Sequence, residues 1–138
     1  VLTSEQAAEN LSKSLVSLTQ NKWMVLCMAS LAMLILGCFL ETVPALLISV
    51  PLFGPLVVSF GIDPIHFGVV LTYVLLLGIV HPPVGLGIFA VCAVTQLRIE
   101  DVIRATLLFY PAFLVILFML IFVPSLSTWL PSIVFAQS

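Results

Sequence analysis

Apolar residues fill most of the chain in long stretches, which are separated by short polar or proline-containing segments. Residues 23–40 contain no charged side chain and would form roughly 27 Å of helix at 1.5 Å per residue. That length is close to the thickness of the hydrocarbon core of a bilayer. Lys22 and Trp23 begin this segment as a typical interface anchor. The pattern predicts helices that cross or enter a membrane.

A proline doublet interrupts the longest stretch without charged side chains. Pro82 and Pro83 remove two backbone donors and clash with the preceding turn, while Gly78 and Gly85 loosen the backbone on both sides. We therefore predict a discontinuous transmembrane helix over residues 61–97. Unpaired backbone groups are tolerated at membrane depth only where protein or water covers them. Helix breaks of this kind usually line a cavity or hold an ion in a transporter.

The segment 22–60 is divided by a short Glu-Thr-Val-Pro sequence, and another apolar stretch follows at once. We expect a helical hairpin over 22–60 with Glu41 and Thr42 at its tip. Pro51 and Pro55 in the second arm leave carbonyls without their usual helical donors. The short apolar turn favours a re-entrant hairpin, which enters and leaves the membrane on the same side. The alternative is a pair of ordinary spans joined by a tight turn, with Glu41 at the surface.

The remaining segments are expected to connect or close this arrangement. Residues 1–21 are polar with one apolar stripe, which predicts either an interfacial amphipathic helix or a plain connector. Asp63 precedes a proline and is predicted to cap the helix that follows. Residues 98–105 are interpreted as a short polar connector. Residues 106–138 are expected to hold a terminal transmembrane helix, which stops at Pro124, and its tail.

The composition places the chain among integral membrane proteins. Charged residues make up 7% of the sequence, whereas soluble domains carry about 25%. The net charge of −2 and the lack of a basic run argue against a nucleic-acid partner. The sequence contains no Ser-His-Asp, Cys-His or carboxylate pair at catalytic spacing and no nucleotide-binding motif, so we do not expect an enzyme.

Several motifs occur in an order that resembles the large membrane subunit of tripartite ATP-independent periplasmic (TRAP) transporters. They are Asn21-Lys22-Trp23, Leu36-Gly37-Cys38-Phe39-Leu40-Glu41, Pro51-Leu52-Phe53-Gly54-Pro55, Gly61-Ile62-Asp63-Pro64-Ile65-His66-Phe67-Gly68, Pro82-Pro83-Val84-Gly85 and Leu130-Pro131. The fourth and fifth motifs in this order are the most specific part. The resemblance, together with the missing initiator Met, implies the C-terminal part of a longer protein, its second inverted repeat.

The resemblance implies an all-α integral membrane fold that is half of an inverted-repeat, elevator-type secondary transporter. It also implies uptake of small organic acids (carboxylates such as dicarboxylates) driven by an ion gradient across the bacterial inner membrane. The implied partners are a small TRAP membrane subunit and a periplasmic substrate-binding protein, besides the lipid bilayer. Na⁺ is the expected coupling ion, and no other cofactor is expected.

In such a fold the hairpin tip would face the unwound segment near the bilayer midplane. Na⁺ would be held by backbone oxygens around Gly78, Pro82 and Gly85, while helix N-termini would present amides to an anionic substrate. The expected ion and substrate site comprises Glu41, Thr42, Gly78, His81, Pro82, Pro83, Val84 and Gly85.

One departure from the family pattern concerns His81, because the family usually has Thr immediately before the paired prolines. An imidazole nitrogen is a poor ligand for a hard cation. Three interpretations of His81 are open: it hydrogen-bonds substrate, it takes up a proton because His titrates near neutrality, or it packs in the bundle with a hydrogen-bonded partner. Glu41 is either a charged group near the ion path or a tip residue that pairs with backbone amides.

Two other functions compete with this one. The first is a structural or assembly membrane protein with proline-kinked helices, and the second is another ion-coupled carrier of the same superfamily. Charge does not orient the chain, because two basic residues lie toward each side. The resemblance favours a cytoplasmic 98–104 loop with the C-terminus outside.

Overall fold

The computed structural model describes residues 3, 6, 10, 13, 14, 17, 18, 20–82 and 84–136. These residues form six helices and contain no strand, so the predicted all-α fold is confirmed. By length and composition, three helices can cross a membrane: α2 (Lys22–Phe39), α3 (Thr42–Ser59) and α6 (Ile99–Phe122). Pro83 and most of the helix predicted over 1–21 lie outside the described residues.

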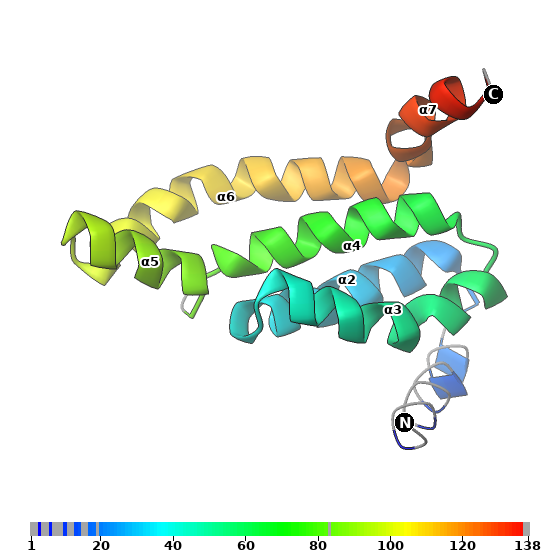
Figure 1. Cartoon of the computed structure of the whole chain (residues 1–138), viewed down its shortest axis with the longest axis horizontal. Coiled ribbons are helices and arrows are strands. Elements are labelled where there is room, and N and C mark those ends of the chain that lie inside the picture. The colour runs from blue at the N-terminus through cyan, green and yellow to red at the C-terminus, as the bar shows by residue number, and fades with distance from the viewer. Residues whose placement is uncertain are drawn as a thin grey trace.

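The helices α2 and α3 form the predicted hairpin, with only Leu40 and Glu41 between them. Figure 1 shows the two arms running side by side in opposite directions. Asn21 begins α2, and its side chain accepts a hydrogen bond from the Trp23 amide at 3.2 Å. The second arm stays helical through its two internal prolines. Each arm has 18 residues, so neither arm is too short to span a bilayer.

The predicted discontinuous helix consists of α4 (Pro64–Ile79) and α5 (Leu86–Thr95). Asp63 caps α4 as expected, because its Oδ1 accepts hydrogen bonds from the amides of Ile65 at 2.8 Å and His66 at 3.3 Å. Residues 80–85 separate the two halves, and Figure 1 shows α5 continuing beyond the end of α4. The interruption falls at the proline doublet.

The charged segment before the last span differs from the prediction. Residues 98–105 do not form a separate connector, since α6 already begins at Ile99. Glu100 and Asp101 occupy the first turn of α6, where negative charge interacts favourably with the helix dipole. The last span ends as predicted, because Pro124 starts a further helix, α7 (Pro124–Phe135). The tail is therefore helical.

Helix α4 is the centre of the bundle. It packs against α2, α3, α6 and α7, and Figure 1 shows it between the hairpin and α6. Val74 and Leu75 in its middle are completely buried. The outer faces remain apolar and exposed, as at Leu108 of α6, which is 79% exposed. Exposed apolar surface of this extent fits contact with lipid or with further protein.

Candidate functional site

The break between α4 and α5 is a compact turn held by its own backbone. The Gly78 carbonyl accepts a hydrogen bond from the His81 amide at 3.1 Å. The His81 carbonyl accepts one from the Gly85 amide at 2.9 Å, and the Gly85 carbonyl accepts one from the Ile88 amide at 3.0 Å. The carbonyls of Gly78 and Gly85, which the sequence suggested as cation ligands, thus already have one partner each.

Two other carbonyls in the break are less well satisfied. Proline at position 83 cannot donate to the carbonyl of Ile79, four residues earlier. Within the described part of the chain, neither the Ile79 nor the Val80 carbonyl receives a hydrogen bond. The backbone of Gly85 packs closely against the Ile79 carbonyl oxygen, because a Cβ atom on Gly85 would lie only 2.2 Å from this oxygen. The Val80 carbonyl is the better candidate for an external ligand.

The hairpin reaches the break through a contact between two glycines. A Cβ atom on Gly78 would lie 2.8 Å from the Gly37 Cα atom and 3.1 Å from the Leu34 carbonyl oxygen. The backbones of α2 and α4 therefore touch within one turn of the hairpin tip and two residues before Val80. Figure 1 likewise shows the α2–α3 connection ending near the gap between α4 and α5. The structure brings together the two segments that the sequence singled out.

The tip contributes one unsatisfied polar atom. Among the described residues, the buried Thr42 hydroxyl oxygen has no hydrogen-bond partner. Leaving such a group unpaired costs about 1–3 kcal/mol, so its retention calls for an explanation. Thr42 is also the first residue of α3, where the helix carries partial positive charge. This position combines a free oxygen with a helix N-terminus.

The structure decides against one of the two interpretations of Glu41. It occupies the N-cap position of α3, but its side chain makes no capping hydrogen bond. The expectation that Glu41 pairs with backbone amides is therefore wrong, because its side chain is exposed and leaves the first amides of α3 uncapped. The interpretation as a charged group near an ion path stays a prediction.

Val84, another residue of the expected site, lies in the break and is 37% exposed.

His81 has a hydrogen-bonded partner, as one interpretation predicted. Its Nδ1 atom bonds the hydroxyl of Tyr110 on α6, and the two ring centroids lie 5.2 Å apart. Sequence reasoning missed Tyr110. The available signal was a tyrosine placed within an otherwise apolar span, which needs a polar partner.

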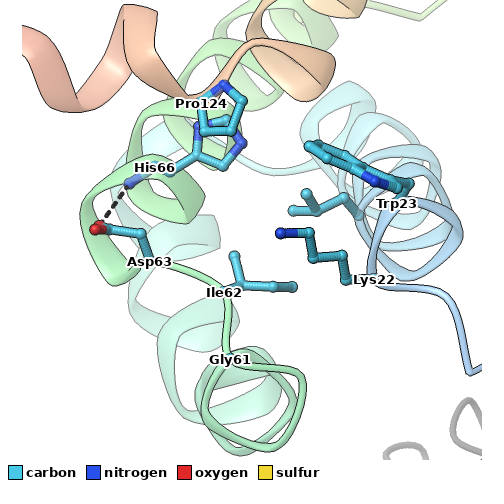
Figure 2. A pocket seen from close by; sticks show the side chains of 8 residues that line it. Lys22, Trp23, Gly61, Ile62, Asp63, His66 and Pro124 are labelled. Carbon is cyan, nitrogen blue, oxygen red and sulfur yellow. Dashed lines mark hydrogen bonds between the residues drawn. The ribbon is translucent and has the colours of Figure 1, made fainter.

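A second polar cluster lies at the opposite end of α4. Figure 2 shows the Lys22 side chain extending into a cavity of about 150 Å³. The Lys22 Nζ atom lies 4.9 Å from the centroid of the Trp23 ring. His66, buried in the wall of the cavity, has its Nδ1 atom 3.2 Å from the Ser127 hydroxyl. The His66–Ser127 contact joins α4 to α7 in this cluster, and the Asp63 carboxylate caps α4 at the same end.

A metal-binding side-chain cluster is not present in the described part of the chain, since no three His, Cys, Asp or Glu side chains gather there. A cation at the break would depend on backbone and hydroxyl oxygens. The Thr42 hydroxyl and the Val80 carbonyl are of this kind, and hard cations prefer such ligands. The residues present therefore fit Na⁺ better than they fit a transition metal.

Comparison with known proteins identifies a family. Residues 1–126 match the family model described as "Tripartite ATP-independent periplasmic transporter, DctM component". The chain is 36% identical over 132 residues to the C4-dicarboxylate TRAP transporter large permease protein DctM of Pseudomonas aeruginosa, covering 96% of this chain and 31% of that protein. It is 34% identical over 137 residues to the Salmonella typhimurium protein named "Uncharacterized protein YgiK", covering 99% of this chain and 31% of that one.

A relative named for a different substrate is similar over nearly the whole chain. The chain is 31% identical over 134 residues to the sialic acid TRAP transporter large permease protein SiaM of Vibrio cholerae, covering 96% of this chain and 31% of that protein. The chain thus spans about a third of the length of the curated relatives it matches. No solved structure gives a significant match.

Proposed function

The chain belongs to the family of TRAP transporter large permease subunits, and from this premise we propose that it forms one half of an ion-driven uptake path for small organic acids. Because the family consists of transporters, the expectation that the chain is not an enzyme is confirmed. The three long apolar helices agree with a multi-pass membrane protein. We place the complete permease in the bacterial inner membrane, with a small membrane subunit and a periplasmic substrate-binding protein as partners.

The observation that carries this proposal is the contact of the hairpin with the helix break. Close packing of Gly37 on Gly78 holds the Thr42 hydroxyl and the Val80 carbonyl at the same end of the α2–α4 crossing. We propose that these oxygens contribute to a Na⁺ site, where the Val80 carbonyl at the negative C-terminal end of α4 offsets the unfavourable positive N-terminus of α3 beside Thr42. A cation held by dehydrated oxygens explains why a buried hydroxyl lacks a protein partner.

The same geometry supports a re-entrant hairpin. The hairpin tip reaches α4 near its C-terminal end, and α5 extends ten residues further on the other side of the break. A hairpin that ends at the level of an interrupted helix has its tip inside the membrane rather than at its far surface. Backbone at that depth must be covered by protein or must line a water-filled cavity.

The names of the relatives support the proposed substrate class. Their names include C4-dicarboxylate, sialic acid and isethionate, all of which are organic acids. An acid anion is stabilised by the positive ends of helices. Helices α3 and α5 begin at the hairpin tip and at the break, respectively. We therefore propose a small organic acid as substrate, with recognition at these two N-termini.

The test is a Thr42→Val substitution in the complete permease, reconstituted with its small subunit and binding protein. Removing one cation ligand is expected to raise the Na⁺ concentration for half-maximal uptake about tenfold, equivalent to roughly 1.4 kcal/mol. Thr42→Ser, which keeps the oxygen, should remain close to wild type.

Thr72→Val serves as the matched control, because among the described residues the exposed Thr72 hydroxyl bonds only its own helix, donating to the Gly68 carbonyl at 2.8 Å. Equal responses of Thr42→Val and Thr72→Val would contradict the Na⁺ site. The absence of any Na⁺-dependent acid uptake by the wild-type permease would favour the structural or assembly protein instead.

A further inference from the structure

The break contains a single side chain that can form hydrogen bonds. Residues 79–87 read Ile-Val-His-Pro-Pro-Val-Gly-Leu-Gly, so His81 is the one polar side chain in this segment. Both its backbone groups are already used, since the amide donates to Gly78 and the carbonyl accepts from Gly85. Any side-chain recognition by the break must therefore come from the His81 imidazole.

One nitrogen of this imidazole is held by Tyr110. The Tyr110 hydroxyl is half-buried between α6 and the core, and Nδ1 of His81 is its hydrogen-bond partner among the described residues. If Nδ1 donated the proton, the hydroxyl proton of Tyr110 would itself have no acceptor there. When Tyr110 donates to Nδ1, both groups are satisfied. A neutral imidazole in that arrangement carries its own proton on Nε2.

The second nitrogen is available to a ligand. The Nε2 atom of His81 has no hydrogen-bond partner among the described residues. Unlike the unpaired Thr42 hydroxyl oxygen, it is not fully buried. This differs from His66, whose Nε2 atom is fully buried. A reachable N–H group donates to an anion and does not ligate a cation.

We propose that Tyr110 is a positioning residue for substrate recognition, which holds His81 as an Nε2–H donor to the acid group of the substrate. The inference rests on the proposed function and adds that different groups bind the cation and the substrate. The Na⁺ ion takes oxygens from the hairpin tip and the break, whereas the acid anion takes the imidazole N–H. Tyr110 contacts neither and acts through the orientation and tautomer of His81.

The experiment compares Tyr110→Phe with Tyr73→Phe in the complete permease with its partners. Tyr73 is the matched control, because its hydroxyl likewise makes a hydrogen bond to another segment: it joins α4 to α6 by donating to the Phe113 carbonyl at 3.0 Å. The probes are radiolabelled succinate, N-acetylneuraminate and isethionate, each tested for uptake by the wild type. Tyr110→Phe should raise the half-saturating acid concentration about tenfold, with the half-saturating Na⁺ concentration changed less than about twofold.

A second variant separates positioning from general damage. His81→Gln places an amide N–H near the position of Nε2 without needing a partner at Nδ1. Uptake by His81→Gln should therefore be nearly insensitive to Tyr110→Phe, so that the two substitutions are strongly non-additive. Histidine ¹⁵N spectra should show the Nε2–H tautomer of His81 in the wild type and a tautomer mixture in Tyr110→Phe.

The failures are distinguishable. If the wild-type permease takes up none of the three acids, the proposed function fails and this inference fails with it. If wild-type uptake is Na⁺-dependent but Tyr110→Phe matches Tyr73→Phe, only the positioning role is overturned. That role is also overturned if Tyr110→Phe shifts the Na⁺ and acid concentrations equally, or if its effect persists in the His81→Gln background.

Discussion

The two ends of α4 each present a histidine whose Nδ1 atom meets a hydroxyl from the C-terminal third of the chain. At the N-terminal end, His66 meets the hydroxyl of Ser127. At the C-terminal end, His81 meets the hydroxyl of Tyr110. The side-chain chemistry is nearly the same, but the backbone around the two histidines is not.

At the N-terminal end the backbone is complete. The Asp63 carboxylate accepts hydrogen bonds from two amides of the first turn, and His66 is only 2% exposed. At the other end, prolines replace the donors and the Val80 carbonyl receives no hydrogen bond from the described residues. A membrane histidine thus takes its role from its surroundings. His66 is enclosed by the bundle, and its buried Nε2 atom has no hydrogen-bond partner among the described residues, whereas the interrupted backbone beside His81 leaves the Nε2 atom of His81 accessible to a ligand.

The largest expected effect comes from adding one methyl group at the break. In Gly85→Ala, the new Cβ atom would lie 2.2 Å from the Ile79 carbonyl oxygen, so the turn must change shape. We expect destabilisation by about 1–3 kcal/mol and loss of most uptake. Thermal unfolding of the purified permease and initial uptake rates measure the two effects.

The matched control is Gly68→Ala on α4, where a Cβ atom meets nothing within 4 Å. This variant should keep wild-type uptake and stability, because alanine favours the helix. Wild-type behaviour of Gly85→Ala would mean that the break is not tightly packed, and the contrast between the two ends of α4 would disappear.

A smaller effect is expected at the capped end. Asp63→Ala removes the acceptor for two first-turn amides and should lower the free energy of unfolding by about 1 kcal/mol. Because this end lies away from the break, the half-saturating concentrations of Na⁺ and acid should not change. Asp63→Asn retains a capping oxygen and should be close to wild type in unfolding experiments. A large shift in Na⁺ dependence with Asp63→Ala would show that the two ends are coupled.

The smallest expected effect concerns pH. If His81 acts as a neutral donor and does not take up a proton, the pH dependence of Na⁺-driven uptake from pH 6 to pH 8 should be the same in the wild type and in His81→Thr, although the variant lacks the imidazole donor and should take up less acid. Uptake assays at clamped internal pH compare the two profiles. A pH dependence that is present in the wild type and missing in His81→Thr would instead support protonation during transport.

The sequence predicts the features of this structure that depend on residues close together in the chain. The hairpin, the interruption at the proline doublet and the Asp63 cap each follow from residues within a few positions of the feature. The start of α6 is the exception, because the charged residues within 98–105 predict a connector, whereas α6 begins at Ile99. Acidic residues such as Glu100 and Asp101 are also typical of a helix start, because they interact favourably with its dipole.

The parts that sequence reasoning missed depend on contacts between distant segments. The pairing of His81 with Tyr110 joins residues 29 positions apart and leaves no periodic trace in the sequence. The Gly37–Gly78 approach joins two helices whose relative rotation local propensity does not determine. The Ile79 carbonyl, in contrast, could have been predicted, because the loss of a donor at Pro83 affects the residue four positions earlier.

The contact between Gly37 and Gly78 also constrains the length of the first hairpin arm. Each residue turns a helix by about 100°, so inserting one residue between Trp23 and Gly37 would rotate the glycine away from α4 and put a side chain against its backbone. Insertions and deletions in this arm should therefore be more damaging than apolar substitutions at its exposed positions. The number of residues between the interface anchor and the crossing is a requirement in addition to the identity of the buried ones.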